Sequence, residues 1–322
     1  VEGALSAAAC DAVRGRCQQI LEEMLRIDGK RHGNRGAGRY SMGAAALSGQ
    51  QLHHVEWAEL LADPVLDALD SVYGEGRYVL SGGGGEIVLG HVDEYQDLHA
   101  DISKQPPSCD SRDRPPLMIV NFAVHDIWED HGPTRIWPGR GRPHDHARPM
   151  RQDAEPVDVL RSTLAPMRAG SCVVRDARIW HGGTPNMRAY PRYLPNLEFF
   201  SAEYNEVVRA SSYRGRYGGT LSPEVFARLS PRARRVCASL LAHDAPPPLG
   251  LKPNFVRPQG KLFREQLLAR LAATPVGGEF VFQGNGFECH LALDIVQSQG
   301  NFRAAIEVTH GPRRMMATRL YQ

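Results

Sequence analysis

The apolar positions at the start of the chain recur with the period of an α-helix. From Leu5 to Ile27 they fall on one side of such a helix, and the residues between them are mostly polar or charged. The Gly- and Arg-rich residues 28–43 follow and are expected to form a loop. A second helix is expected over residues 51–61. A third is expected from Pro64, because proline suits a first helical turn.

Period-two alternation replaces the helical period after residue 80. Gly82–Gly85 lacks the order of a phosphate-binding loop, so we expect a turn between strands there. Short strands separated by Pro- and Gly-containing loops then continue to Glu203. This pattern predicts a mainly β fold with flanking helices, built on a double-stranded β-helix core, the cupin-like jelly roll.

One polar residue interrupts the apolar strand expected over residues 117–124. Alternation places Asn121 on the face opposite Val120 and Phe122, among small or apolar neighbours. Such an asparagine suits a cavity wall, and it equally suits a buried amide satisfied by the backbone. The sequence leaves these two interpretations even.

Helix signals return after the β region. Three helices are expected there, from Ser222-Pro223-Glu224, over residues 231–241 and over residues 261–273. The tail then alternates like β-strands near residues 280–282, 289–295 and 302–308. We expect one domain over residues 1–245. Residues 246–322 would then form an appendage, a helix plus a small β unit, whose role the sequence does not indicate.

Composition and charge limit the classes of function. The 322 residues carry a formal net charge of +2, so no broad positive field favours nucleic acid, and a small-molecule substrate is expected. No apolar run reaches the roughly 18 residues that a membrane span needs. Six cysteines without C-x-x-C spacing favour free thiols and a cytoplasmic protein. Because the chain starts at Val1, the sequence does not exclude an upstream targeting segment. It does not exclude a homo-oligomer either.

Two histidines and one aspartate form a candidate metal site. His99 and Asp101 are two residues apart, so they share one face of an extended segment. His181 would complete the set from another strand. Two imidazoles and a carboxylate on one side of Fe(II) leave the opposite positions for a co-substrate and O2. An H-x-D pair alone also arises by chance in a surface loop.

Arg192, eleven residues after His181, strengthens the case for this site. A guanidinium is the side chain best shaped to bind a carboxylate through two parallel hydrogen bonds. 2-Oxoglutarate chelates iron at one end and carries a carboxylate at the other, so it would need such a residue. We therefore expect Fe(II), 2-oxoglutarate and O2 to be used together.

Four segments and the arginine that follows them share an order and spacing with a known family. They are QDLHAD (residues 96–101), HGPTRIWPG (131–139), RAGSCVVRD (168–176), HGGTPN (181–186) and then Arg192. Over roughly its first two thirds, the chain resembles the phytanoyl-CoA dioxygenase family of Fe(II)/2-oxoglutarate oxygenases. One departure is Arg140-Gly141-Arg142, where the family commonly has Ser-His.

The resemblance implies roles at matching positions. His99, Asp101 and His181 would bind iron, and Arg192 would pair with the distal carboxylate of 2-oxoglutarate. Further co-substrate contacts are implied for Gln96, Thr134 and Asn121.

The reaction implied is oxidation of a small organic metabolite, usually hydroxylation, with decarboxylation of 2-oxoglutarate to succinate. Asp101 is present, whereas halogenating relatives replace this carboxylate with a small residue, so halogenation is disfavoured. The sequence does not distinguish hydroxylation from desaturation, epoxidation or rearrangement, and it does not identify the substrate. Two alternatives use the same fold: a cupin-like metal-dependent hydrolase or isomerase, and a non-catalytic binding protein.

Overall fold

The computed structural model describes residues 1–43, 50–96, 98–102, 114–138, 162–210 and 220–245, together with four later strands. The chain divides into two compact units, Val1–Asn254 and Phe255–Gln322, and each is described by itself. The segment Arg140-Gly141-Arg142 and the helix expected over residues 261–273 lie outside the described residues.

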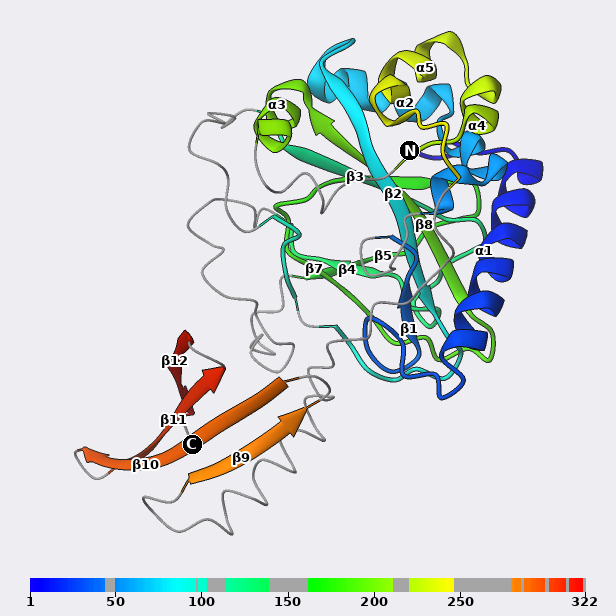
Figure 1. The fold of residues 1–322 in the computed structure, drawn as a ribbon. Helices are drawn as coiled ribbons and strands as arrows, with labels where there is room; N and C mark the ends of the chain where they lie inside the picture. The colour runs from blue at the N-terminus through cyan, green and yellow to red at the C-terminus, as the bar shows by residue number, and fades with distance from the viewer. Residues whose placement is uncertain are drawn as a thin grey trace. The chain divides into compact units, whose positions relative to one another are not determined.

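The first unit is built on two antiparallel β-sheets (Figure 1). The larger has the order β1-β2-β8-β3-β6, with β1 Arg39–Ser41, β2 Tyr78–Val88, β8 Arg192–Ser201, β3 Leu117–Phe122 and β6 Cys172–Asp176. The smaller has the order β5-β4-β7, with β5 Thr163–Ala165, β4 Thr134–Ile136 and β7 His181–Gly183. Two antiparallel sheets flanked by helices confirm the predicted mainly β, jelly-roll fold.

The two faces of β3 pack against different groups of residues, as the alternation predicts. Val120 and Phe122 belong to the main apolar core, which also holds the buried faces of the helices. Ile119 and Ala123 belong to separate clusters on the other face. Asn121 shares that second face, so its amide points into the space between the sheets.

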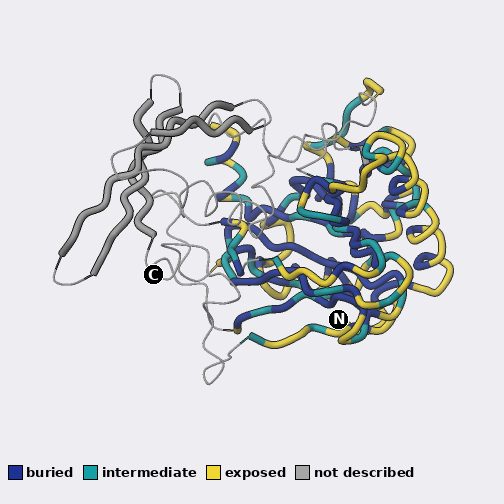
Figure 2. The backbone as a smooth tube through the Cα atoms, turned by 90° about the horizontal axis from the view of Figure 1, so that it is seen from below, coloured by how far each residue is buried: buried dark blue, intermediate teal, exposed yellow. Residues whose placement is uncertain are grey.

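The helices that precede β2 cover one face of the larger sheet, and their buried residues are dark blue in Figure 2. α1 (Ala7–Ile27) begins after Ser6, whose hydroxyl accepts a hydrogen bond from Ala9 N at 3.1 Å. α2 (Asp63–Tyr73) has a proline in its first turn, as expected. The prediction of a single helix over residues 51–61 is wrong. Two 3₁₀ helices, η1 (Gln50–His53) and η2 (Val55–Leu60), form there because His54 between them has extended dihedral angles.

The glycine run does not form the expected turn. Gly82–Gly85 lies inside β2, and the strand continues through it to Val88. A Cβ atom at Gly84 would lie 2.5 Å from Gly43 Cα, and one at Gly83 would lie 2.9 Å from Asn196 O. Neighbouring backbone therefore approaches Gly83 and Gly84 too closely for any side chain, so these two glycines serve packing and not chain reversal.

Short helices end the first unit. They are α3 (Ala202–Ala210), α4 (Pro223–Arg228), α5 (Pro231–Cys237) and η7 (Ala238–Leu240). The second unit holds a sheet in the order β12-β11-β10-β9, formed by β9 Glu279–Gly284, β10 Phe287–Ser298, β11 Asn301–His310 and β12 Arg313–Leu320. The first three strands match the predicted alternation, and β12 was not predicted. Among the described residues, no helix combines the length and apolar character needed to cross a bilayer.

Candidate metal centre and co-substrate pocket

The structure brings His99, Asp101 and His181 together. One potential ligand atom from each lies within 4.8 Å of those of the other two. His181 comes from β7 and is buried, whereas the other two come from the short segment 98–102 and are more accessible. Side chains more than 80 residues apart in sequence therefore converge as the H-x-D pair and the downstream histidine predict.

Backbone hydrogen bonds fix the two segments that carry these side chains. His99 N–H donates to His181 O, and His181 N–H donates to His99 O, both at 2.9 Å. Asp101 N–H donates to Ala177 O at 3.0 Å. Farther along the same two segments, Gly183 N–H donates to the Gln96 side-chain oxygen at 2.9 Å. The Gln96 side-chain oxygen thus links the two segments. The resemblance implied a co-substrate contact for Gln96 and did not indicate this structural role.

The imidazole of His181 is held in the form that binds a metal. Its Nδ1 lies 3.1 Å from the acceptor Ile179 O and 3.3 Å from the donor Arg175 Nη1. When Nδ1–H donates to the closer Ile179 O, Nε2 keeps a free lone pair. That Nε2 lies 3.5 Å from Asp101 Oδ2. Burial, reinforced by the charge of Arg175, lowers the pKa of His181 to about 3. A neutral imidazole with its lone pair facing a carboxylate is suited to a shared metal ion.

Arg175, on β6, contacts the cluster and was missed from the sequence. Its Nη2 donates to Asp101 Oδ2 at 2.8 Å, and its Nε donates to Asn121 Oδ1 at 3.3 Å. Burial favours the neutral form of Asp101, but the charges of His181 and Arg175 overcome it and hold the pKa of that carboxyl well below its usual range. Arg175 was not singled out because a lone arginine in an apolar strand carries no local signal.

Glu198, on β8, is a second carboxyl group near the cluster. Burial, and then the charge of Asp101, raises its pKa to about 7. Asp101 is therefore ionised at neutral pH, while Glu198 is divided between its charged and neutral forms. The two carboxyl groups differ because Arg175 hydrogen-bonds Asp101 directly.

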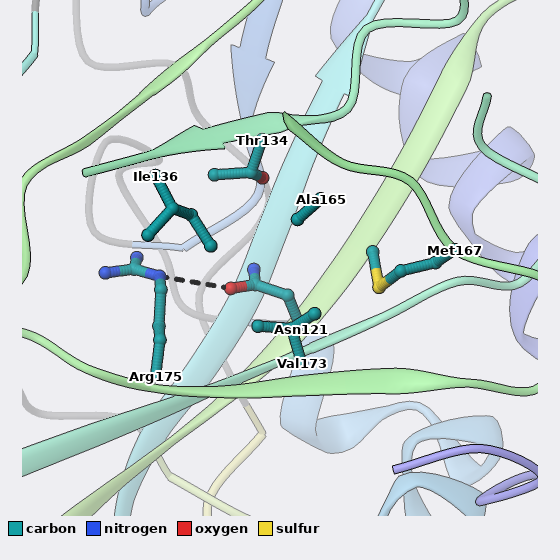
Figure 3. Close-up of a pocket in the computed structure, with 7 residues that line it drawn as sticks. All are labelled: Asn121, Thr134, Ile136, Ala165, Met167, Val173 and Arg175. Carbon is teal, nitrogen blue, oxygen red and sulfur yellow. Dashed lines mark hydrogen bonds between the residues drawn. The ribbon is translucent and has the colours of Figure 1, made fainter. Parts of the chain in front are cut away.

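A small pocket opens beside the cluster, between the two sheets (Figure 3). Its lining residues come from β3, β4, β5, β6 and the residues next to β5: Asn121, Thr134, Ile136, Ala165, Met167, Val173 and Arg175. Asn121 and Thr134, two implied co-substrate contacts, therefore line the same small pocket, where the Asn121 side-chain oxygen accepts a hydrogen bond from Arg175 Nε. The remaining lining is largely apolar, which suits a site that excludes water.

Arg192, at the start of β8, is 1% exposed. In the part of the chain that the structure describes, its Nε and Nη2 have no hydrogen-bond partner, and the carboxylate of Glu86 lies 3.9 Å from Nη2. Burial lowers the pKa of Arg192 to about 10, so it is a cation at neutral pH. A buried guanidinium with unused N–H groups costs free energy unless a ligand supplies acceptors. Arg192 therefore fits the carboxylate-binding role, although it does not line the small pocket itself.

The residues present fit a ferrous ion and 2-oxoglutarate. Two imidazoles and one ionised carboxylate on one side match the ligand preference of non-haem Fe(II). Among the described residues this is the one cluster of three or more such groups that could hold a metal ion. The unused donors of Arg192 match a carboxylate.

Comparison with known proteins agrees with this geometry. The family model of phytanoyl-CoA dioxygenase (PhyH) matches residues 1–193, more than half of the chain. The chain belongs to this family. It is therefore a non-haem oxidoreductase, an oxygenase that uses Fe(II), 2-oxoglutarate and O2.

Solved structures with a related fold are more distant. The non-heme monooxygenase ThoJ is 18% identical, with a TM-score of 0.46, over 62% of this chain and 72% of that one. The epimerase SnoN from nogalamycin biosynthesis is 18% identical, with a TM-score of 0.43, over 63% and 76%. HygX from Streptomyces hygroscopicus, solved with nickel, 2-oxoglutarate and hygromycin B, is 15% identical, with a TM-score of 0.42, over 62% and 81%.

Proposed function

We propose that this oxygenase hydroxylates a small organic metabolite, with decarboxylation of 2-oxoglutarate to succinate. In this proposal His99, Asp101 and His181 hold the iron, and Arg192 binds the distal carboxylate of 2-oxoglutarate. The observation that carries it is the convergence of three ligand atoms within 4.8 Å at the edge of a pocket between the sheets.

Each group of residues has a defined task in this reaction. When bound, iron and 2-oxoglutarate supply the oxidising chemistry, and the protein supplies geometry and a dry site. Arg175 orients the Asp101 carboxylate through its 2.8 Å hydrogen bond. Ile179 O fixes the tautomer of His181.

The pocket lining supports the assignment of the co-substrate. Asn121 and Thr134 offer an amide and a hydroxyl for polar contacts, and Met167 and Val173 are apolar neighbours that keep water out. Asp101 retains a carboxylate at the position that a halogenating enzyme would leave open, which supports oxygen transfer over halide transfer.

The test is anaerobic addition of Fe(II) and 2-oxoglutarate to the purified protein. A visible charge-transfer absorption band is expected for wild type, and Arg192→Gln should weaken 2-oxoglutarate binding by about 100-fold, because a buried charged pair is lost. Arg188→Gln is the matched control, since Arg188 pairs with the exposed Asp130. No band in wild type, or equal affinity in Arg192→Gln, would contradict the proposal.

The reaction outcome has its own test. Candidate metabolites are incubated aerobically with the loaded protein, and products are followed by mass spectrometry. Hydroxylation gives a product that has gained one oxygen atom, together with one succinate per turnover. A product that has lost two hydrogens, or an isomer of the substrate, would replace hydroxylation with desaturation or rearrangement.

A further inference from the structure

Two arginines lie in one row across three adjacent strands. Arg39 of β1 is directly opposite Val88 of β2, and Val88 is directly opposite Arg192 of β8. Residues directly opposite each other in antiparallel strands project from the same face of the sheet. Tyr40, the neighbour of Arg39, lies in the core beneath the helices, so Arg39 projects from the other face, toward the smaller sheet.

Both guanidinium groups are buried, and both have unused hydrogen-bond donors. Arg39 is 4% exposed, and its Nε and Nη1 have no hydrogen-bond partner among the described residues. Arg192 is 1% exposed, and within the same described part of the chain its Nε and Nη2 have none. Two neighbouring buried cations with unsatisfied N–H groups are strongly unfavourable unless a ligand pairs with both.

The charged side chains around the two arginines do not balance, and one carboxylate more would neutralise them. Glu86, two residues from Val88 on β2, is the carboxylate between the two arginines, and it lies 3.9 Å from Arg192 Nη2. Arg35 and Glu94 are also near, but both are exposed and opposite in charge. The group therefore holds two buried positive charges and the one negative charge of Glu86, whose side chain is about one third exposed. A bound carboxylate would neutralise the excess.

The position of Arg39 relative to β7 brings it into the candidate site. A Cβ atom built on Gly183 would lie 2.7 Å from Arg39 Nη1, so Nη1 occupies the space of a side chain at that position. Residue 183 is two after His181 and shares its face of the strand, at a spacing of about 6–7 Å. Thr134 is directly opposite Gly183. Nη1 therefore lies beside the pocket residue Thr134. The strand position that it covers is two residues along β7 from His181 of the metal cluster.

We propose that Arg39 is a second carboxylate-binding residue, which acts with Arg192 on the distal carboxylate of 2-oxoglutarate; this rests on the function proposed above. The Arg39 guanidinium serves two purposes at once. Its Nη2 donates to Glu94 O and Thr184 O, which anchors the segments leading to His99 and away from His181. Its Nε and Nη1 stay available for the ligand. The planar fork of arginine permits this division, and the single ammonium group of lysine does not.

The experiment compares two 2-oxo acids that differ only at the distal end. Ni(II)-loaded protein is titrated calorimetrically with 2-oxoglutarate and with 2-oxopentanoate, in which a methyl group replaces the distal carboxylate. Arg39→Gln should weaken 2-oxoglutarate binding by about 10- to 100-fold, as for a lost charge-assisted hydrogen bond. Binding of 2-oxopentanoate should change by less than about threefold, because that ligand has no group for Arg39 to bind.

Arg39→Lys and the affinity for Ni(II) separate ligand binding from folding. Arg39→Lys keeps a positive charge and one set of donors, so it should fold, bind Ni(II) normally and lose part of the preference for 2-oxoglutarate. Equal weakening of both 2-oxo acids by Arg39→Gln and Arg39→Lys would overturn the inference, because Arg39 would then act only as a scaffold. Unchanged 2-oxoglutarate binding in both variants would overturn it too. Failure of wild type to bind either acid would overturn the proposed function itself.

Discussion

His99 and His181 exchange both of their backbone hydrogen bonds, each at 2.9 Å, and their imidazole rings are 4.5 Å apart between centroids. The separation of these two side chains is therefore set by a β-bridge and not by the side chains themselves. The pairing of β7 with β4 fixes the His181 side of this bridge within the smaller sheet. The site is built as part of the sheet.

The first prediction concerns the metal cluster. His181→Ala removes one ligand, so the affinity of the protein for Mn(II) or Ni(II) should fall by more than about 100-fold, beyond the 10- to 100-fold typical of outer hydrogen-bond partners. His125→Gln is the matched control, since His125 accepts a hydrogen bond from Tyr193 N and lies outside the cluster. Calorimetric titration measures both. Equal affinities in the two variants would remove His181 from the site.

The second prediction concerns Glu86. Glu86→Gln removes the negative charge between Arg39 and Arg192, so the variant should melt at a lower temperature than wild type and bind 2-oxoglutarate several-fold more tightly. The effect is moderate because a third of the Glu86 side chain is exposed, which lets solvent screen its charge. Glu94→Gln is the control, because its side chain is exposed. Weaker 2-oxoglutarate binding in Glu86→Gln would contradict this charge balance.

The third prediction concerns the glycine run in β2. Gly84→Ala should lower the free energy of unfolding by about 3 kcal/mol or more, because its Cβ would meet Gly43 Cα at 2.5 Å, backbone that cannot move aside easily. Gly82→Ala should change it by less than about 1 kcal/mol, since the nearest atom, Glu198 Oε2, is 3.7 Å away. Urea unfolding distinguishes them. Similar losses in the two variants would mean that the close packing is not what selects glycine.

The fourth prediction concerns pH. Burial lowers the pKa of His125 to about 4, below the value of about 6.5 for an unfolded histidine. Between pH 6.5 and 4 the unfolded chain binds a proton at this residue that the native protein does not, so stability falls as the pH falls through this window. Above pH 6.5 the contribution is constant. His125→Asn should reduce the loss of stability between pH 7.5 and 5, measured by urea unfolding. An unchanged loss of stability in His125→Asn would contradict this assignment.

Local patterns were sufficient for part of this molecule. The helical period predicted α1, and alternation in β3 placed Asn121 on the face opposite Val120. The two-residue spacing of His99 and Asp101 predicted that they lie together. In each case the decisive information lies within a few neighbouring residues.

The parts that were missed depend on contacts between distant segments. Gly84 belongs to a strand because it pairs with Asn196 of β8, and it is glycine because Gly43 packs against it. Nothing near Gly84 in sequence shows either contact. Arg39 lies in a Gly- and Arg-rich stretch expected to be a loop, and only its pairing with Val88 brings it level with Arg192. Arg175 gains its place beside Asp101 from the pairing of β6 with β3. Residue types alone do not reveal such relationships.

A crystal structure of the protein grown anaerobically with Mn(II) and 2-oxoglutarate would show which side chains hold the metal. We expect one metal ion coordinated directly by a nitrogen of His99, an oxygen of Asp101 and Nε2 of His181. The keto-acid end of 2-oxoglutarate should occupy the opposite side of the ion, with its distal carboxylate at Arg192. A metal ion held by other residues, or one that leaves any of these three side chains unbound, would contradict the account.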